Sequence, residues 1–392
     1  MGKRVNWRLK NTDAMDTCND FDTEGCISLC ALSNIFSFNC AEGRALMDEF
    51  NDISRIFSLS RRQILDYLGP SGERFADAIL KRETLLWARD EVRWARSAGI
   101  RLIGLGDGAY PWRLAECSDA PLMLYCKGPA DLNAGSALAV VGTRRATYYG
   151  KDFCRKVVES LAFCQKKPLI VSGMALGIDG CAHTAALDAG LTTIGVLPCG
   201  LDEVYPHQHR GLASRILESG GALITDFARA TGTLPYTFVR RNRIIAGMAD
   251  ATLLAESFDP GGGLITARLA HSYGRDVFAV PGRNTDKSFE GCNRLICSLT
   301  ASIVTGTGTI PSAMGWAASR KRLPKQDPEL FRADDTPVKS AVVSLLADRS
   351  PLSVEEIVEA TELDVATLCT NLLELELSGR LVPVQGGKYG LR

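Results

Sequence analysis

The sequence has no excess of charge of either sign and no long apolar run. Its 392 residues include 45 Lys and Arg and 45 Asp and Glu, a formal net charge of zero. This balance excludes a uniformly basic protein that coats DNA, so any nucleic-acid binding would need a local basic patch. No uncharged apolar run approaches ~18 residues, and no membrane span is expected. The N-terminus lacks the apolar core of a signal peptide, and we expect a cytoplasmic protein.

Paired metal ligands and a nucleotide-hydrolysis loop are also lacking. The 13 cysteines form no Cys-x-x-Cys pair, and the four histidines do not group with them. Zinc sites need such paired ligands, so no metal is expected. The odd number of cysteines and the missing signal peptide favour reduced thiols. No Gly-Lys-Ser/Thr sequence closes a Walker A loop, which argues against ATPase activity and against a bound cofactor.

What is present is the composition of a globular protein with several domains. Hydrophobic residues make up 46% and charged residues 23% of the chain. Residues 1–22 are polar and irregular, and we interpret them as a flexible tail. Residues 23–97 carry apolar residues at helical spacing, which predicts a helical domain of the SAM or helix-hairpin-helix kind, or a plain packing module. The proline-containing segment 316–335 is interpreted as a linker.

Residues 98–315 alternate short apolar runs with helical stretches. Runs that are apolar on both faces are typical of buried parallel strands. The pattern predicts an α/β fold, an extended Rossmann-like doubly wound parallel sheet, with strand candidates at Ile103–Leu105 and Leu122–Tyr125 before it. The six main runs are Leu138–Val141, Leu169–Val171, Thr193–Leu197, Ala222–Thr225, Ala251–Ala255 and Val277–Val280.

Residues 336–392 predict a winged-helix domain, because three helical stretches are followed by two short strands. This segment contains eight acidic and five basic residues, a net charge of −3. A net-negative module repels phosphate. We therefore expect the winged helix to serve protein contact or regulation rather than to bind DNA.

Ligands bind beyond the carboxyl ends of the strands in a doubly wound sheet, and three loops predicted there suit phosphate. Their glycines allow close backbone approach, and hydroxyls, an arginine and helix N-termini can bind anions. Solvated strand-to-helix turns are the alternative. The candidate residues are Gly142, Thr143 and Arg144 after the first main run, Ser172 and Gly173 after the second, and Gly261, Gly262, Gly263 and Thr266 after the fifth.

An arginine-rich block with aromatic neighbours lies between the fourth and fifth runs. Residues 227–249 contain four arginines and no acid. Such a block suits single-stranded nucleic acid, because cations follow the phosphates while rings stack on bases at ~1–3 kcal/mol each. The alternative is an amphipathic helix with Ile244 and Ile245 in the core, and both interpretations can hold on different faces of one helix. The candidate residues are Phe238, Arg241, Asn242 and Arg243.

Asp179 and His183 lie four residues apart at the start of a predicted helix. They could form an acid/base pair or a structural pair in which the aspartate caps the helix. No nucleophile lies beside them, so the structural interpretation is favoured.

Seven sequence blocks follow one another in this region: VVGTRRATYYG (140–150), VSGMALGIDGCAHTAAL (171–187), GLDEVYP (200–206), FVRRNRIIAG (238–247), GGGLITARLA (261–270), VFAVPG (277–282) and GCNRLI (291–296). Taken in order, these blocks resemble the DNA-processing protein A (DprA/Smf) family. The resemblance implies a single-stranded DNA-binding protein rather than an enzyme. It implies protection of incoming strands during natural transformation (competence), loading of the RecA recombinase in DNA recombination, and a homodimer formed through the Rossmann-like domain. It also implies that the candidate residues above form one DNA-binding pocket.

An enzyme on the same scaffold remains the alternative. Nucleotide phosphoribohydrolases are similar in having a Pro-Gly-Gly phosphate loop, and this chain has Pro260 before its three glycines and Glu256 nearby. Those enzymes place a carboxylate and an arginine after the loop. Here Leu264, Ile265 and Thr266 follow instead, which favours the binding protein.

Overall fold

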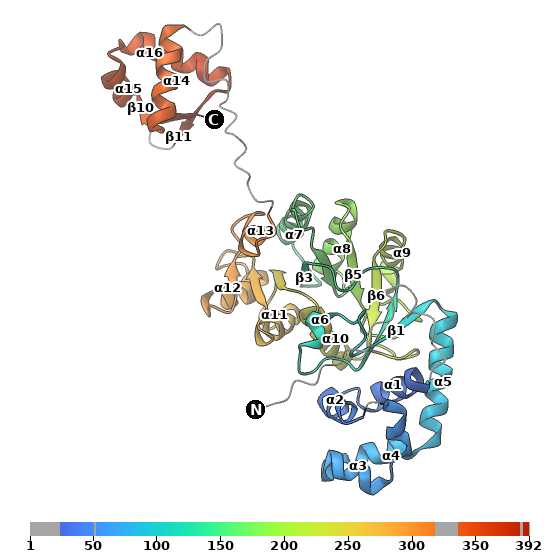
Figure 1. Cartoon of the computed structure of the whole chain (residues 1–392). Coiled ribbons are helices and arrows are strands. Elements are labelled where there is room, and N and C mark those ends of the chain that lie inside the picture. The colour runs from blue at the N-terminus through green and yellow to red at the C-terminus, as the bar shows by residue number, and fades with distance from the viewer. Residues whose placement is uncertain (1–23, 51, 318–335, 385–386, 392) are drawn as a thin grey trace. The chain divides into compact units, whose positions relative to one another are not determined.

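The computed structural model describes residues 24–50, 52–317, 336–384 and 387–391 (Figure 1). They belong to two compact units, Met1–Ala318 and Ser319–Arg392. The expected flexible tail lies outside the described residues, as does nearly all of the expected linker. Trp316, which we assigned to the linker, is buried in the core of the first unit.

The first unit begins with a helical part that packs on the sheet. Ser60 and Gln63 form a capping box that starts α3, and Gly69, at φ +68°, ends it. The core of this part includes Leu32, Phe36 and also Leu122 beside the sheet. The helices are α1 (Glu24–Ile35), α2 (Cys40–Asp48), α3 (Arg61–Leu68), α4 (Glu73–Leu80) and α5 (Arg82–Ser97), with the short turns η1 (Ile53–Ser58) and η2 (Pro70–Gly72).

A nine-stranded sheet, counted over the described residues, dominates the first unit, in the order β1-β2-β6-β5-β4-β3-β7-β8-β9. β3 to β9 run parallel, while β1 and β2 join one edge antiparallel. All six main runs form strands, and the two earlier candidates do as well. The strands are β1 (Ile100–Gly104), β2 (Met123–Lys127), β3 (Ala137–Gly142), β4 (Leu169–Ser172), β5 (Thr193–Val196), β6 (Ala222–Thr225), β7 (Ala251–Glu256), β8 (Asp276–Ala279) and β9 (Ser302–Ile303).

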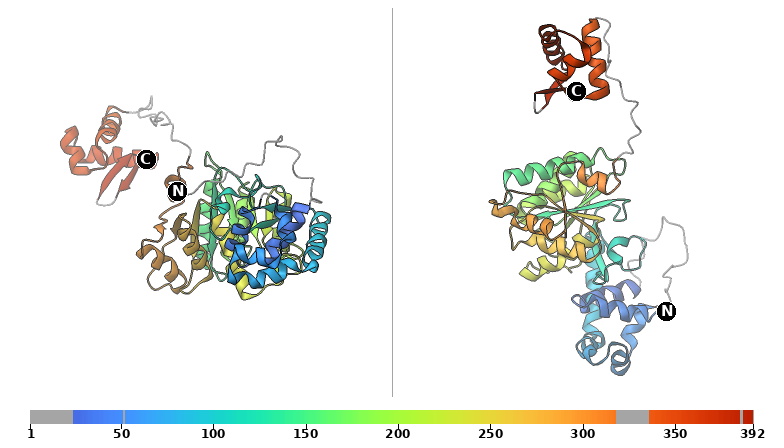
Figure 2. Two further views of the ribbon diagram at one scale, coloured as in Figure 1. Left: turned by 60° about the horizontal axis from the view of Figure 1, so that its bottom comes forward. Right: turned by 90° about the vertical axis from the view of Figure 1, so that its left-hand side faces the viewer.

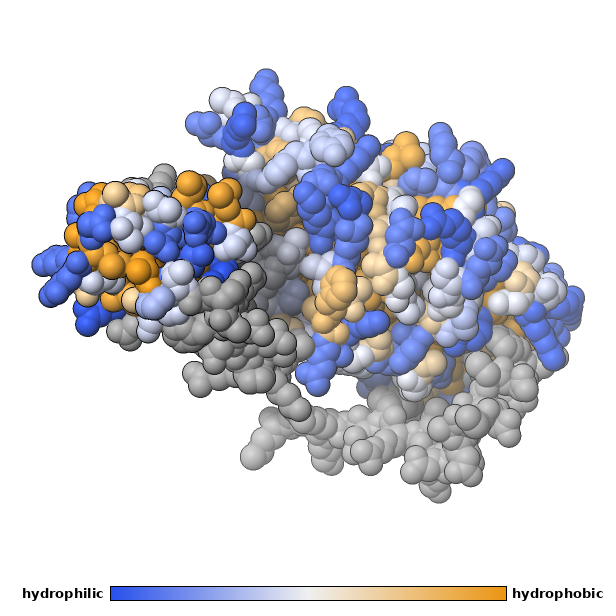
Figure 3. All heavy atoms as spheres, turned by 90° about the horizontal axis from the view of Figure 1, so that it is seen from above, coloured by the Kyte–Doolittle hydropathy of each residue, from blue (hydrophilic) through white to orange (hydrophobic). Residues whose placement is uncertain are grey.

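Helices cover both faces of this sheet, as a doubly wound fold requires (Figure 2). One face carries α7 (Tyr148–Leu161), α8 (Ile178–Asp188) and α9 (Arg210–Glu218); the other carries α10 (Pro235–Gly247), α11 (Gly262–Ser272) and α12 (Glu290–Cys297). The short helices α6 (Trp112–Ala115) and α13 (Thr309–Ala313) complete the unit. Figure 3 shows hydrophilic residues interspersed with small apolar areas on the face that it draws.

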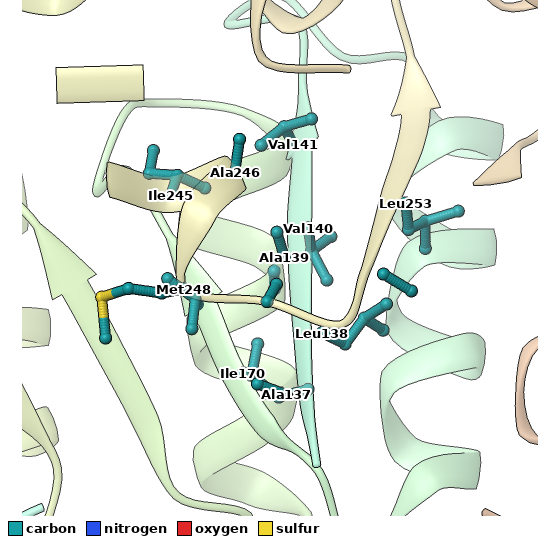
Figure 4. Packing of buried hydrophobic residues seen from close by; sticks show 14 of the residues in the cluster. Ala137, Leu138, Ala139, Val140, Val141, Ile170, Ile245, Ala246, Met248 and Leu253 are labelled. Atoms are coloured by element: carbon teal, nitrogen blue, oxygen red, sulfur yellow. The ribbon is translucent and has the colours of Figure 1, made fainter. Parts of the chain in front are cut away.

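The core is centred on β3, which is sandwiched between the helix layers. Ala137 to Val140 are fully buried, and Figure 4 shows them beside Ile170 of β4, Leu253 of β7 and Ile245 of α10. Full burial of each large aliphatic side chain contributes roughly 1.5–3 kcal/mol. Ile245 is thus a core residue of α10, as the amphipathic interpretation expected.

The second unit is the predicted winged helix. Three helices pack around Val343, Leu346 and Leu372, and Ser353 and Asp364 cap two of them. Its small sheet has the order β10-β12-β11. The elements are α14 (Pro337–Arg349), β10 (Leu352–Ser353), α15 (Val354–Thr361), α16 (Val365–Leu377), β11 (Leu381–Val384) and β12 (Lys388–Leu391).

Membrane-spanning helices and metal clusters are both lacking within residues 24–50, 52–317, 336–384 and 387–391. None of the helices in these ranges combines the length and apolar character that crossing a bilayer demands. Within the same ranges, His, Cys, Asp and Glu side chains do not gather in groups of three that could hold a metal ion.

Candidate nucleic-acid interface

A cleft of about 410 Å³ opens beyond the carboxyl ends of β3 and β7. The strand order reverses between these two neighbours, since the chain proceeds to β4 on one side of β3 and to β8 on the far side of β7. Such a switch point is where doubly wound sheets bind ligands. Ten of the thirteen predicted site residues line this cleft: Gly142, Thr143, Arg144, Phe238, Arg241, Asn242, Gly261, Gly262, Gly263 and Thr266.

Glycines let the two loops that border the cleft pack backbone against backbone. A Cβ added at Gly142 would lie 2.9 Å from the carbonyl oxygen of Glu256, and one added at Gly263 would lie 3.1 Å from the Gly142 Cα. Either contact would force the loops apart. Gly262 differs, because an added Cβ would meet no described atom within 4 Å. It is the exposed first residue of α11 and offers an unobstructed backbone surface to a ligand.

The exposed Arg144 and the half-buried Phe238 form a cation and ring pair at the cleft. The Arg144 guanidinium carbon lies 4.7 Å from the centroid of the Phe238 ring. Tyr205 supports the same ring edge-on, with centroids 5.6 Å apart. The ring therefore holds the guanidinium without neutralising it, and Arg144 keeps donors for an anion.

A second cation, Arg241, lies at the floor of the cleft and is buried. Its guanidinium donates hydrogen bonds to the carbonyl oxygens of Gly173 and Val196 and, over 3.2 Å, to Oδ1 of Asn242. Burial lowers the pKa of Arg241 to about 10, and the nearby Asp179 carboxylate opposes that shift. Arg241 thus stays charged at neutral pH and adds positive potential beneath Arg144.

Asp179 is the one carboxylate among the described residues that line the cleft. It accepts hydrogen bonds from the backbone N–H groups of Gly173 (3.2 Å) and Ala175 (3.3 Å). Burial raises its pKa to about 6, despite the opposing charge of Arg241. His183 makes a separate contact, with its Nδ1 2.7 Å from Oγ1 of Thr193. Both side chains have structural contacts, as favoured, but Asp179 organises the loop before α8 instead of pairing with His183.

Two further carboxylates near the glycine turn are already engaged. Glu256, at the end of β7, is fully buried and accepts hydrogen bonds from the backbone N–H and the hydroxyl of Thr147 at the start of α7. Asp259 forms an ion pair with Arg294 of α12. Arg294 therefore offsets the charge of Asp259, whereas the Glu256 carboxylate is held by hydrogen bonds at the start of α7 and does not line the cleft.

The structure does not bring Ser172, Gly173 and Arg243 into the cleft. Ser172 is fully buried, and its hydroxyl donates to the carbonyl oxygen of Val140 over 2.6 Å. Gly173 has a different use, since a Cβ there would lie 2.5 Å from the Arg241 guanidinium. It makes room for that buried cation.

The prediction that Arg243, in the acid-free segment 227–249, belongs to the DNA-binding residues is wrong. The side chains of Arg243 and Arg240 both bind the buried carboxylate of Asp226, at 2.6 and 2.8 Å. Burial alone would raise the pKa of Asp226, but the two arginines hold it below its usual range. The triad ties α10 to the end of β6 and is a structural feature.

Comparison with known proteins shows which family this chain belongs to. The family model described as DNA recombination-mediator protein A matches residues 101–315, more than half of the chain. This chain belongs to that family. A second model, the DprA winged helix domain, matches residues 326–387.

Individual relatives of the family cover most of the chain. Protein Smf of Escherichia coli is 35% identical over 304 residues, which span 76% of this chain and 79% of that protein. The putative DNA processing protein DprA of Mycobacterium tuberculosis is 33% identical over 317 residues, 80% of this chain and 78% of its own. The X-ray structure of DNA processing protein A from Streptococcus pneumoniae superposes with a TM-score of 0.53 at 32% identity, covering 67% of this chain and 96% of that one.

Several cleft residues were not among those predicted. Arg145 is exposed beside Arg144, and its guanidinium carbon lies 6.0 Å from the centroid of the Phe258 ring. Phe258 and Pro260 belong to the loop after β7, where the prediction names the three glycines and Thr266 and uses Pro260 only for the phosphoribohydrolase alternative. Arg145 could have been predicted from the sequence, because a second arginine in the same loop can bind phosphate as well as the first.

The cleft also bears on the phosphoribohydrolase alternative. The carboxylate that suggested it, Glu256, is fully buried and bonded to Thr147. After the glycine turn, Leu264 and Thr266 are buried as well. The geometry thus offers cations and an aromatic ring to a ligand, together with the single carboxylate of Asp179.

Proposed function

We propose that this protein binds single-stranded DNA in the strand-end cleft and acts as a recombination mediator. The observation that carries the proposal is the exposed Arg144 guanidinium on the Phe238 ring, beside the open backbone of Gly262. Cations contact phosphates of any sequence, and a ring stacks only on a base that has left its own stack. Together they favour a single strand over a duplex.

The test places a negative charge in the cleft without disturbing the fold. In Gly262→Glu the new side chain enters open space, and a carboxylate at the first residue of α11 is compatible with the helix dipole. Gly211→Glu is the matched control, because Gly211 is equally open and lies on α9. Binding of a labelled oligothymidylate and of a duplex is followed by fluorescence anisotropy.

We expect the wild type and Gly211→Glu to bind the single strand more tightly than the duplex, with an affinity that falls as salt rises. Gly262→Glu should weaken single-strand binding at least tenfold. Equal affinity of the wild type for strand and duplex, or equal binding by the two variants, would contradict the proposal.

The mediator role is proposed on the family membership: the protein would load RecA recombinase onto strands coated by single-strand-binding protein, within the cytoplasm and during natural transformation. RecA ATPase activity on coated strands measures it. The wild type should shorten the lag before ATP hydrolysis, and Gly262→Glu should not. A wild type that binds the strand and leaves the lag unchanged would refute loading while leaving DNA binding intact.

The homodimer through the Rossmann-like domain is likewise a proposal. Sedimentation equilibrium of the full chain and of a chain without residues 336–392 tests it. Both should sediment as dimers. A monomer in either case, at concentrations where the strand is bound, would refute it.

The winged helix is proposed to contact protein, not DNA. Its α16 carries no lysine or arginine, and Leu373 and Leu377 on it are exposed. A helix that enters a DNA groove relies on cationic and polar side chains to reach phosphates and base edges. Removing residues 336–392 should therefore leave oligothymidylate affinity within twofold of the wild type.

A further inference from the structure

A second cavity lies beyond the carboxyl end of β8, next to the first turn of α7. Its volume is about 750 Å³. The loop after β8 supplies one wall and the short turn η4 (Lys287–Phe289) another, while Thr147 and Tyr149 supply the third. None of the thirteen predicted site residues lines it.

The walls of this cavity are fixed by their own contacts. Asn293 of α12 accepts from the Gly282 N–H over 3.1 Å and donates to the Gly282 carbonyl oxygen over 3.0 Å. A Cβ at Gly282 would lie 2.2 Å from Phe289, so the loop after β8 rests directly on that ring. The cavity is therefore pre-formed, and binding there would need little ordering.

The aromatic ring of Tyr149 lines the cavity and packs against two further rings. The Tyr149 ring lies 5.4 Å from the Phe289 ring and 6.1 Å from the Phe153 ring, between centroids. Tyr149 nevertheless remains 49% exposed, and its neighbour Tyr148 is 87% exposed. Large rings held in place with half of their surface in water are what a stacking platform requires.

The charges around this cavity balance, unlike those of the cleft. Arg283 and Asp286 both line it, and the exposed Lys287 and Glu290 follow. Net attraction for a phosphate is therefore small. A nucleobase, which is planar and uncharged, matches a supported ring in a neutral cavity better than a phosphate does.

One short segment connects the cleft to this cavity. Arg144 and Arg145 line the cleft, and Thr147 and Tyr149, a few residues on, line the cavity. Both openings follow neighbouring parallel strands, β7 and β8, so they lie along the same edge of the sheet. A strand that leaves the cleft past Arg145 would reach Tyr149 next.

We propose that this cavity is a base-stacking subsite, in which Tyr149 stacks on a base of the same DNA strand beyond those in the cleft. The inference rests on the proposed single-strand binding and extends its footprint toward β8. It predicts that affinity depends on strand length, because a short strand fills the cleft and a longer one also reaches the cavity.

The test measures affinity for a ladder of oligothymidylates of increasing length. Tyr149→Ala should leave the shortest bound strands unaffected and weaken the longer ones about 5- to 150-fold, the range expected for loss of one stacked base. Tyr149→Phe keeps a ring and should behave as wild type. Tyr67→Ala is the matched control, since Tyr67 is 50% exposed and packs on Phe50 at 5.2 Å.

Photo-crosslinking gives a second readout that does not depend on folding of a variant. A long oligonucleotide with 5-iodouracil should crosslink the wild type at Tyr148 or Tyr149, and the yield should fall with the shortest strands. A wild type that binds no strand would refute the proposed function itself. A wild type that binds but shows no length dependence on Tyr149, and no crosslink in this segment, would refute only the subsite.

Discussion

Arg144 offers a direct measurement of how the cleft binds a strand. Its guanidinium rests on the Phe238 ring at 4.7 Å and is exposed to solvent. If it contacts a phosphate, Arg144→Ala removes one cation and one charge-assisted hydrogen bond. The slope of log affinity against log salt should then become shallower by about 0.7, the value for one phosphate on a single strand. The hydrogen bond is worth ~1.5–3 kcal/mol, so affinity should fall roughly 10- to 150-fold.

The conservative variant Arg144→Lys separates charge from shape. Lysine keeps the cation, so the salt slope should match that of the wild type. It loses the planar contact with the Phe238 ring, worth ~0.5–1 kcal/mol at an exposed site, and affinity should fall roughly two- to fivefold. The two variants together therefore distinguish a counterion effect from a stacking effect.

The assay is anisotropy titration of an oligothymidylate over a salt series. Arg89→Ala serves as the control, because Arg89 is exposed on α5 in the helical part. Its affinity and slope should equal those of the wild type. The reasoning fails if Arg144→Ala weakens binding with an unchanged slope, or if Arg89→Ala changes the slope by as much.

Three further predictions concern stability. Asp226→Asn leaves two buried arginines without their carboxylate and should lower the free energy of unfolding by about 3–5 kcal/mol in urea titrations; a loss below 1 kcal/mol would contradict the triad. The pKa of Asp179 is raised to about 6 and that of His183 is lowered to about 3. As the pH rises through roughly 4–6, ionisation of Asp179 therefore lowers the free energy of unfolding by up to about 3 kcal/mol. His183 has the opposite effect over this range, because its neutral form is the one that the folded protein favours. Asp179→Asn should therefore become more stable relative to wild type as pH rises through that window, and a flat difference would refute the shift. Gly173→Ala, which crowds Arg241, should cost about 1–3 kcal/mol in the same titrations, and an unchanged midpoint would show that the guanidinium can move.

The glycine turns show which parts of the candidate site can be predicted from local sequence. Gly142 and Gly263 are predicted from their places after buried strands, and in the structure they bring the two loops into close backbone contact at the cleft. Parallel strands of a doubly wound sheet end at one edge, so loops that are distant in sequence must meet there. Gly173 follows a neighbouring strand of the same sheet but serves to admit Arg241, which no local pattern reveals.

The sequence by itself determined the architecture and the edge of the sheet at which the cleft opens. Runs that are apolar on both faces are typical of interior strands, and that information is local, although β2 is buried and antiparallel, so burial does not fix a strand's direction. The tertiary structure alone decided which arginines are available. Within segment 227–249, Arg229 pairs with the distant Glu91 at 3.1 Å, and Asp226 neutralises Arg243 from just outside the segment. A charge interacts with whatever the fold places within a few ångströms, so a stretch without acids was no measure of free positive charge.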